Sequence, residues 1–211
     1  MRLKIKKTGS FKSSKKYLDL IANSKVYDVA TNTPISYAAN ISTKLGNDVF
    51  LKREDMQPIF SFKIRGAYNK IANLTPQQKK RGVLTASAGN HAQGVARAVT
   101  TRGLKATIIM PEDTPATKIE GTKAYGADVV TYDRYTESRE EIGEALSQKY
   151  NANLIKPYDD VRVIAGQGTV GLEIARQVSV MGVVPNALIC CCGGGGSGRG
   201  LWSLCGDGKS K

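Results

Sequence analysis

The sequence has 211 residues, of which 41% are apolar, and this length is enough to bury a sizeable core. No apolar run reaches the roughly 18 residues that a membrane-spanning helix needs, so we expect no membrane partner. The formal net charge of +13 would attract anions, such as nucleic acid, an anionic membrane surface or a small anionic ligand.

Much of the positive charge lies at the start of the chain. Residues 1–18 hold no acidic residue, and their basic residues are Arg2, Lys4, Lys6, Lys7, Lys12, Lys15 and Lys16. Like charges repel and keep a segment disordered, so we predict that residues 1–16 form a flexible basic arm. A remnant of an organelle transit peptide is the alternative, although such peptides favour Arg over Lys. Because the charge is concentrated in this arm and no RNA-binding motif is present, we expect no nucleic-acid partner.

From residue 49 onward, short apolar strands alternate with helical stretches. The strands are expected at residues 49–51, 83–86, 106–110, 128–132, 154–155 and 187–192. The helices are expected at residues 64–74, 77–81, 91–102, 137–149 and 168–178, with one more that Thr114-Pro115 caps and that runs to Ala124. Such alternation predicts an α/β fold of right-handed βαβ units around a parallel sheet.

Residues 197–211 break this pattern. Glycines interrupt every candidate helical turn, at Gly198, Gly200, Gly206 and Gly208. Each glycine costs a helix about 1 kcal/mol relative to alanine. We therefore predict no helix here and a chain that stops in the middle of a βα unit.

Three of the four cysteines are consecutive, at Cys190, Cys191 and Cys192. Neighbouring residues on a strand point to opposite faces, so these thiols cannot close on one metal ion. There is no C-x-x-C pair, and His91 is the only histidine, so we expect no metal site. Adjacent thiols instead indicate a buried strand in a reducing compartment.

Lys63 is the first candidate for chemistry. It lies where the apolar strand at 49–51 and a charged turn pass into the helix at 64–74, with Phe62 beside it. Burial of an amine lowers its pKa, because a low dielectric disfavours the charged form. A neutral amine can attack a carbonyl group and form a Schiff base. An ordinary solvated lysine is the alternative, since most of the 31 Lys and Arg residues must lie on the surface.

Two loops are candidates for binding an anion. Ser87-Ala88-Gly89-Asn90-His91 leads from a strand into a helix, whose N-terminal amides suit a carboxylate or phosphate; an ordinary capping turn is the alternative. Gly193-Gly194-Gly195-Gly196 follows a predicted strand, and its amides could wrap an anion; a flexible linker is the alternative. A cofactor with a carbonyl group and a phosphate satisfies both loops and Lys63, which points to pyridoxal phosphate.

Two other glycine motifs carry no such prediction. Gly166-Gln167-Gly168-Thr169-Val170-Gly171 matches G-x-G-x-x-G, but it has no clear strand before it and no acidic residue about twenty positions on, so we expect no dinucleotide site. Gly208-Lys209-Ser210 resembles the end of a Walker A motif, but Ser203 stands where its first glycine belongs.

Several longer motifs resemble the threonine ammonia-lyases, which belong to the fold type II (tryptophan-synthase-β-like) enzymes that use pyridoxal phosphate. The motifs are Lys52–Asp55, Gln57-Pro58, Ser61–Tyr68, Ser87–Gly94, Val163–Thr169 and Gly193–Gly196. The resemblance runs from about Tyr17 to Gly196. Gln57-Pro58 is more similar to the biosynthetic branch, which serves isoleucine synthesis, than to the catabolic one.

This resemblance implies a three-layer parallel-sheet architecture that is incomplete at the C-terminal end. A catalytic domain would span residues 17–211, after the basic arm at 1–16. A small sub-domain would span about 56–160, and a partial large sub-domain would combine 17–55 with 161–211.

The resemblance also implies roles for single residues. Lys63 would form the Schiff base with the cofactor and move the substrate's Cα proton, and Phe62 would pack beside the cofactor ring. Asn90 would bond to the cofactor's 3′-hydroxyl. The substrate carboxylate would bind to Ser87, Ala88, Gly89, Asn90 and His91. The cofactor phosphate would bind to Gly193, Gly194, Gly195, Gly196 and the amide of Ser197.

The implied reaction is α,β-elimination, which converts L-threonine to 2-oxobutanoate and ammonia and L-serine to pyruvate. The family implies a homo-oligomer in the cytoplasm, or in mitochondria or plastids. A serine racemase is one alternative, but Ala88 stands where such racemases carry a second serine. A non-catalytic basic fragment is another.

The sequence departs from the family after Gly196. Ser197 replaces a leucine, and Arg199 replaces a small residue. Since this change coincides with the loss of the helical pattern, we expect a truncated or frame-altered product. An incomplete sheet would expose an unpaired edge, so we expect poor solubility, weak cofactor retention and little turnover.

Overall fold

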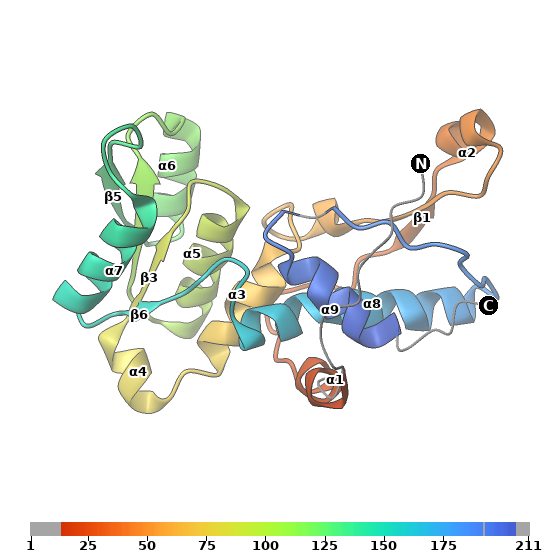
Figure 1. Ribbon diagram of the computed structural model, residues 1–211, viewed down its shortest axis with the longest axis horizontal. Helices are drawn as coiled ribbons and strands as arrows, with labels where there is room; N and C mark the ends of the chain where they lie inside the picture. The colour runs from red at the N-terminus through yellow and green to blue at the C-terminus, as the bar shows by residue number, and fades with distance from the viewer. Residues whose placement is uncertain (1–13, 192, 206–211) are drawn as a thin grey trace, which may run out of the picture.

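The computed structural model describes residues 14–191 and 193–205. Its largest sheet has four strands in the order β5-β4-β3-β6, and every neighbouring pair is parallel (Figure 1). The strands are β3 (Val83–Ala86), β4 (Ala106–Pro111), β5 (Asp128–Tyr132) and β6 (Asn153–Leu154). This parallel sheet confirms the predicted α/β class.

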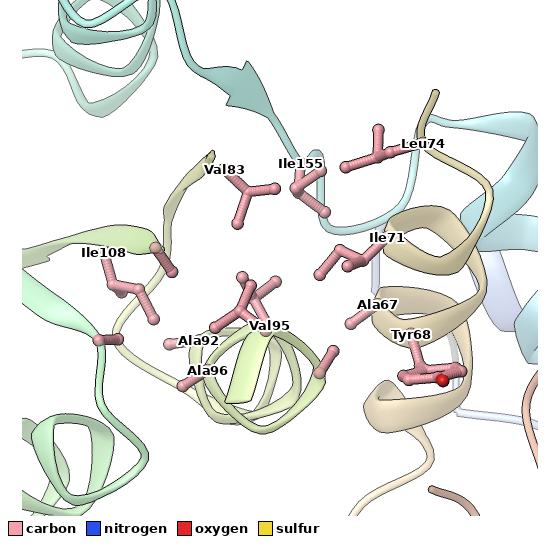
Figure 2. Close-up of a cluster of buried hydrophobic side chains, with 14 of the residues drawn as sticks. Ala67, Tyr68, Ile71, Leu74, Val83, Ala92, Val95, Ala96, Ile108 and Ile155 are labelled. Carbon is pink, nitrogen blue, oxygen red and sulfur yellow. The ribbon is translucent and has the colours of Figure 1, made fainter. Parts of the chain in front are cut away.

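Helices join successive strands and cover both faces of this sheet. They are α5 (Asn90–Arg102), α6 (Ala116–Ala124) and α7 (Arg139–Lys149). The main core lies on one face, between the strands, α5 and α3 (Lys63–Ala72), and it includes Ala67, Ile71, Val83, Val95 and Ile108 (Figure 2). A smaller core lies on the other face, beside α7, and includes Leu84, Ile109, Tyr132, Ile142 and Leu146. The sheet is therefore the middle of three layers, as the resemblance implies.

A second group of helices lies beside the sheet, and α3 stands between the two parts (Figure 1). The group consists of α1 (Ser14–Ala22), α8 (Val161–Val180) and α9 (Gly196–Cys205), with α8 packed against α1, α3 and α9. Glycines allow the close approach: a methyl group on Gly166 of α8 would lie 2.5 Å from the Arg65 carbonyl oxygen of α3. Among the residues that the structure places, no helix is long and apolar enough to cross a membrane.

Most elements of the sheet follow from local signals. The strands predicted at 83–86 and 128–132 are found with the same bounds, and those predicted at 106–110 and 154–155 agree within one residue. The short helix α4 (Pro76–Arg81), expected at 77–81, begins with a reciprocal cap in which Thr75 and Gln78 bond to each other's backbone amides. By contrast, Thr114 does not cap α6, because Pro115 is the N-cap residue and the Thr114 hydroxyl has no partner within the described residues.

The strand predicted at 49–51 exists but belongs to a different sheet. β2 (Phe50–Lys52) pairs antiparallel with β1 (Ile35–Tyr37), and α2 (Ala39–Leu45) lies between them in the chain. A short helical turn, η1 (Glu54–Met56), follows β2. We did not expect β1, because its three residues carry too little periodicity to be recognised.

Two predictions for the last part of the chain are wrong. Residues 187–191 form no strand: Ile189 is 94% exposed, Cys191 is exposed and Cys190 is half-buried. Within the part of the chain that the structure describes, this segment pairs with no strand of either sheet. Cys192 lies outside the described residues.

The described part of the chain after Ser197 is helical rather than irregular, and residues 206–211 lie outside the described residues. α9 runs from Gly196 to Cys205, because its glycines allow close packing on α8 and this contact outweighs their low helix propensity. The loss of a helical pattern at Ser197 is thus no longer a reason to expect an altered reading frame. α8 also begins at Val161, seven residues before the predicted start, and Asp160 caps it.

At the other end of the chain, α1 begins at Ser14, so the last three residues assigned to the basic arm have helical backbone. The rest of that arm, residues 1–13, lies outside the described residues. The sub-domain boundaries stay a prediction.

Candidate functional site

Lys63 is the first residue of α3, and Phe62 is the N-cap residue of that helix. The Lys63 ammonium donates a hydrogen bond to the Pro157 carbonyl oxygen at 2.9 Å. It also lies 5.5 Å from the centroid of the Phe62 ring. Partial burial lowers the pKa of Lys63 from its usual value, so its neutral, nucleophilic form is more accessible than that of a solvated lysine. This environment is the one that the sequence predicts for a Schiff-base lysine.

The loop Ser87–His91 lies at the C-terminal end of β3, and α5 begins within it at Asn90. Ser87 Oγ accepts a hydrogen bond from the Gly89 amide at 3.3 Å, which shapes the turn. A methyl group on Gly89 would meet no atom within 4 Å, so the space in front of the helix N-terminus is open. Asn90 is exposed, and Ala88 is half-buried. The amides at this helix end are therefore free to receive a carboxylate.

The side chain of His91 is buried, unlike those of the other residues in this loop. Its side chain is only 3% exposed, and Nε2 lies 3.1 Å from the Ile155 carbonyl oxygen. Burial, helped by the nearby positive charge of Lys63 and opposed by the hydrogen bond to Ile155, lowers the pKa of His91 to about 4. The imidazole is thus neutral at physiological pH, so His91 can offer a carboxylate its backbone amide but no positive charge.

Gly193–Gly196 leads directly into α9 rather than acting as a linker. Gly195 has a φ of +79°, which favours glycine, and Gly196 is the first residue of the helix. A methyl group on Gly194 would overlap the Tyr158 ring, and one on Gly196 would lie 2.9 Å from Gln167 Oε1. A methyl group on Gly193 would meet nothing within 4 Å. The loop and the following Ser197 thus present a helix N-terminus, the feature that binds phosphate in many proteins.

One segment, residues 155–158, contacts all three candidate groups. The Ile155 carbonyl faces His91, the Pro157 carbonyl accepts from Lys63, and the Tyr158 ring covers Gly194. The first turns of α3 and α5 also meet, since a methyl group on Gly94 would lie 3.2 Å from the Lys63 carbonyl oxygen. The predicted lysine and both predicted loops therefore belong to one region.

The sequence did not reveal a buried ionic cluster behind Lys63. Arg65 is completely buried and forms ion pairs with Glu54 at 2.8 Å and with Glu173 at 2.6 Å, while Lys52 pairs with Glu173 at 2.6 Å. Burial opposes the charge of Glu173, but the hydrogen bonds from Arg65 and Lys52 outweigh it and lower the pKa of Glu173. The Arg65–Glu173 pair joins α3 to α8 at a position two residues after Lys63. The only signal in the sequence is that Arg65 stands on the apolar side of a helix.

The residues of this region fit pyridoxal phosphate. A half-buried lysine can bind the carbonyl group, and the N-terminus of α9 can bind the phosphate. Open space lies at Gly89 and Gly193, and the buried side chains of His91 and Gln167 have polar atoms without a partner within the described residues. These features suit a ligand with both a carbonyl group and an anionic group.

Comparisons with known proteins agree with this reading. The family model described as pyridoxal-phosphate dependent enzyme matches residues 26–210, which extends past Gly196, where we expected the resemblance to end. The biosynthetic L-threonine dehydratase of Pasteurella multocida is 45% identical over 163 residues, which are 77% of this chain and 32% of that protein. A mitochondrial threonine dehydratase of Schizosaccharomyces pombe and a chloroplastic one of Solanum lycopersicum also match.

Solved structures share the fold. The processed form of threonine deaminase isoform 2 from Solanum lycopersicum has a TM-score of 0.81 and 41% identity, and the match covers 93% of this chain and 53% of that one. Maize serine racemase has a TM-score of 0.81 and 35% identity, with 90% and 57% covered. The chain thus spans about a third of the bacterial relative and about half of the two solved chains. The match to the family model covers most of the chain, and we conclude that the chain belongs to the family of pyridoxal-phosphate dependent enzymes.

Proposed function

We propose that the protein containing this chain deaminates L-threonine by α,β-elimination, which yields 2-oxobutanoate and ammonia. The observation that carries the proposal is the position of Lys63, half-buried at the start of α3, beside the two loops with helix N-termini. The identity of 45% to a biosynthetic threonine dehydratase supports threonine as the substrate. L-serine would react in the same way and give pyruvate.

In this proposal, each part of the site handles one part of the substrate or cofactor. The amides at the start of α5, at Asn90 and His91, bind the substrate carboxylate, and the neutral His91 ring adds no charge of its own. The amides at Gly196 and Ser197 bind the cofactor phosphate. Asn90 is exposed at the start of α5 and would bond to the cofactor's 3′-hydroxyl, and Phe62, which lies beside Lys63, would pack on the cofactor ring.

Lys63 is the proposed catalytic base. Its lowered pKa would make the neutral amine available to hold the cofactor through its carbonyl carbon, and, after the substrate's amino group had replaced it there, the freed amine would accept the proton from the substrate Cα. Bound pyridoxal phosphate supplies an electron sink for the electrons of the broken Cα–H bond. The β-hydroxyl then leaves as water, and one water molecule is consumed when ammonia is released, so the two waters cancel.

The wider setting is part of the same proposal. Elimination from threonine would be the first step of isoleucine biosynthesis, in a homo-oligomeric enzyme of the cytoplasm, or of mitochondria or plastids as in two of the matching relatives.

Borohydride trapping tests the proposal. The chain is mixed with pyridoxal phosphate, its visible absorption spectrum is recorded, and the adduct is reduced and mapped by peptide mass spectrometry. We expect a visible band and a label on Lys63, and both should be lost in Lys63→Ala. A sample of wild type that has not been reduced should form a 2-oxo acid from L-threonine. Labels scattered over exposed lysines, with no visible band, would refute the proposed role of Lys63.

Serine racemisation is the second candidate, since maize serine racemase shares the fold at 35% identity. Ala88 has no group that could exchange a proton on the opposite face of the substrate, which favours elimination. Measuring D-serine against pyruvate from L-serine separates the two, and a predominance of D-serine would favour the racemase.

A further inference from the structure

The side chain of Gln167 is buried and has no hydrogen-bond partner among the described residues. The residue lies in α8 and is 1% exposed, and neither Nε2 nor Oε1 has a partner within the residues that the structure describes. Buried polar side chains in proteins are nearly always paired, because an unpaired one loses its bonds to water without replacement. An unpaired carboxamide in this position therefore points to a ligand.

The side chain of Gln167 runs between the lysine helix and the glycine loop. A methyl group on Gly66, one turn after Lys63 in α3, would lie 3.0 Å from Gln167 Cγ. A methyl group on Gly196, the first residue of α9, would lie 2.9 Å from Gln167 Oε1. The end of the side chain is thus at the N-terminus of α9. Its terminal torsion has a broad energy profile, so the amide can turn its NH₂ group toward a ligand without moving α8.

We propose that Gln167 is a phosphate-binding residue, whose carboxamide NH₂ donates a hydrogen bond to an anion held at the N-terminus of α9. The amides of the glycine loop approach that anion from the helix end, and Gln167 would approach it from α8. A neutral donor adds a bond without adding a charge to the region around Lys63. The identification of the anion as the phosphate of pyridoxal phosphate rests on the proposed function.

Comparison of two cofactor forms tests this role. Affinities of the full chain for pyridoxal phosphate and for pyridoxal, which lacks the phosphate, are measured by fluorescence titration in wild type and in Gln167→Met. Methionine fills the same volume but cannot donate. A hydrogen bond to a charged group corresponds to a loss of about tenfold or more in affinity. We expect this loss for pyridoxal phosphate and a change below about twofold for pyridoxal.

Two further measurements use no cofactor. The melting temperature of the unliganded Gln167→Met chain should equal or exceed that of wild type, because a buried unpaired amide has been removed. Inorganic phosphate should raise the melting temperature of wild type and not that of Gln167→Met. Gln177→Met is the matched control on the same helix: its carboxamide bonds to Lys52, Asn32 and the Thr33 carbonyl, so this variant should melt lower and keep the wild-type preference for the phosphorylated cofactor.

The outcomes separate this inference from the proposed function. Equal losses for both cofactor forms in Gln167→Met, or no loss for either, would overturn the role of Gln167 even if Lys63 is labelled. A wild-type chain that responds neither to pyridoxal phosphate nor to inorganic phosphate would overturn it as well. Phosphate binding that depends on Gln167, in a protein that does not turn over threonine, would support the role of Gln167 and refute the proposed reaction.

Discussion

Gly200 of α9 and Gly168 of α8 meet backbone to backbone. A methyl group on Gly200 would lie 2.8 Å from both the Cα and N atoms of Gly168. We expect Gly200→Ala to lower the free energy of unfolding by about 1–3 kcal/mol, because the two helices must separate to admit the methyl group. The glycine loop at the start of α9 would shift with the helix, so cofactor affinity should fall too. Urea denaturation and cofactor titration measure the two effects.

Gly198→Ala is the control on the same helix. A methyl group there would meet no atom within 4 Å, so alanine's higher helix propensity should raise the free energy of unfolding by up to about 1 kcal/mol. If both variants destabilise the protein equally, helix contact is not the reason for glycine at position 200.

Arg65 links α3 to Glu54 and to Glu173 of α8 inside the protein. We expect Arg65→Met to lower the free energy of unfolding by about 3–5 kcal/mol, because two carboxylates then lose their buried partner. Arg65→Lys should recover only part of the loss, since a single ammonium cannot bond to both carboxylates in the geometry of a guanidinium. Denaturant unfolding measures these differences as shifts of the midpoint, with the dependence of the free energy on denaturant concentration unchanged.

The Arg53–Asp55 pair is a matched control for the buried cluster. Its two residues flank Glu54 in the sequence but are solvent-exposed, so Arg53→Met should change the free energy of unfolding by less than about 1 kcal/mol. A similar loss in both variants would mean that the Arg65 cluster contributes no more than a surface ion pair.

His91 makes the stability of the folded protein depend on pH. Its pKa is lowered to about 4 by burial, whereas an unfolded chain has the usual value near 6.5. Between these two values the unfolded state binds a proton that the folded state excludes, so stability falls as the pH drops from about 6.5 to 4. The pKa difference corresponds to about 3 kcal/mol. Denaturation midpoints at pH 7, 5.5 and 4.5 measure the loss.

His91→Gln removes the titrating group and keeps a donor that can reach the Ile155 carbonyl. This variant should show a smaller loss of stability over the same pH range. Parallel pH curves for wild type and variant would contradict a neutral, buried His91.

The lowered pKa of Lys63 predicts an early rise in reactivity with pH. Only the neutral amine attacks an aldehyde, so its labelling by pyridoxal phosphate and borohydride should reach half its maximum at a lower pH than the labelling of exposed Lys149 in the same sample. Peptide mapping over pH 6 to 10 gives both curves. Coincident curves would show that burial does not activate Lys63.

Much of the sheet could be read from the sequence, because its signals are local. Gly103 ends α5 in a left-handed conformation, and Thr75 and Gln78 cap α4 through their own side chains. The candidate positions Lys63 and Gly193–Gly196 also follow from local pattern: Lys63 stands between a strand and a helix, and the four glycines directly follow an apolar run.

Other features depend on contacts between distant segments. The apolar run at 187–191 resembles a strand, but it pairs with no strand of the described residues. α9 is helical although its glycines disfavour a helix, because these glycines let it pack closely against α8. Gln167 looks like an ordinary polar residue until α3 and α9 enclose it, so no sequence pattern could have identified it.

The contacts of residues 155–158 have a consequence for how the protein folds. Lys63 and Pro157 are 94 positions apart, and His91 and Ile155 are 64 apart. Contacts between such distant positions form only after long stretches of chain have closed, and they are among the last to be completed. A chain that has formed its local helices but not these closures has no assembled site. Capture of pyridoxal phosphate at Lys63, if it occurs as proposed, would therefore report the completion of folding and serve as a kinetic probe of the final step.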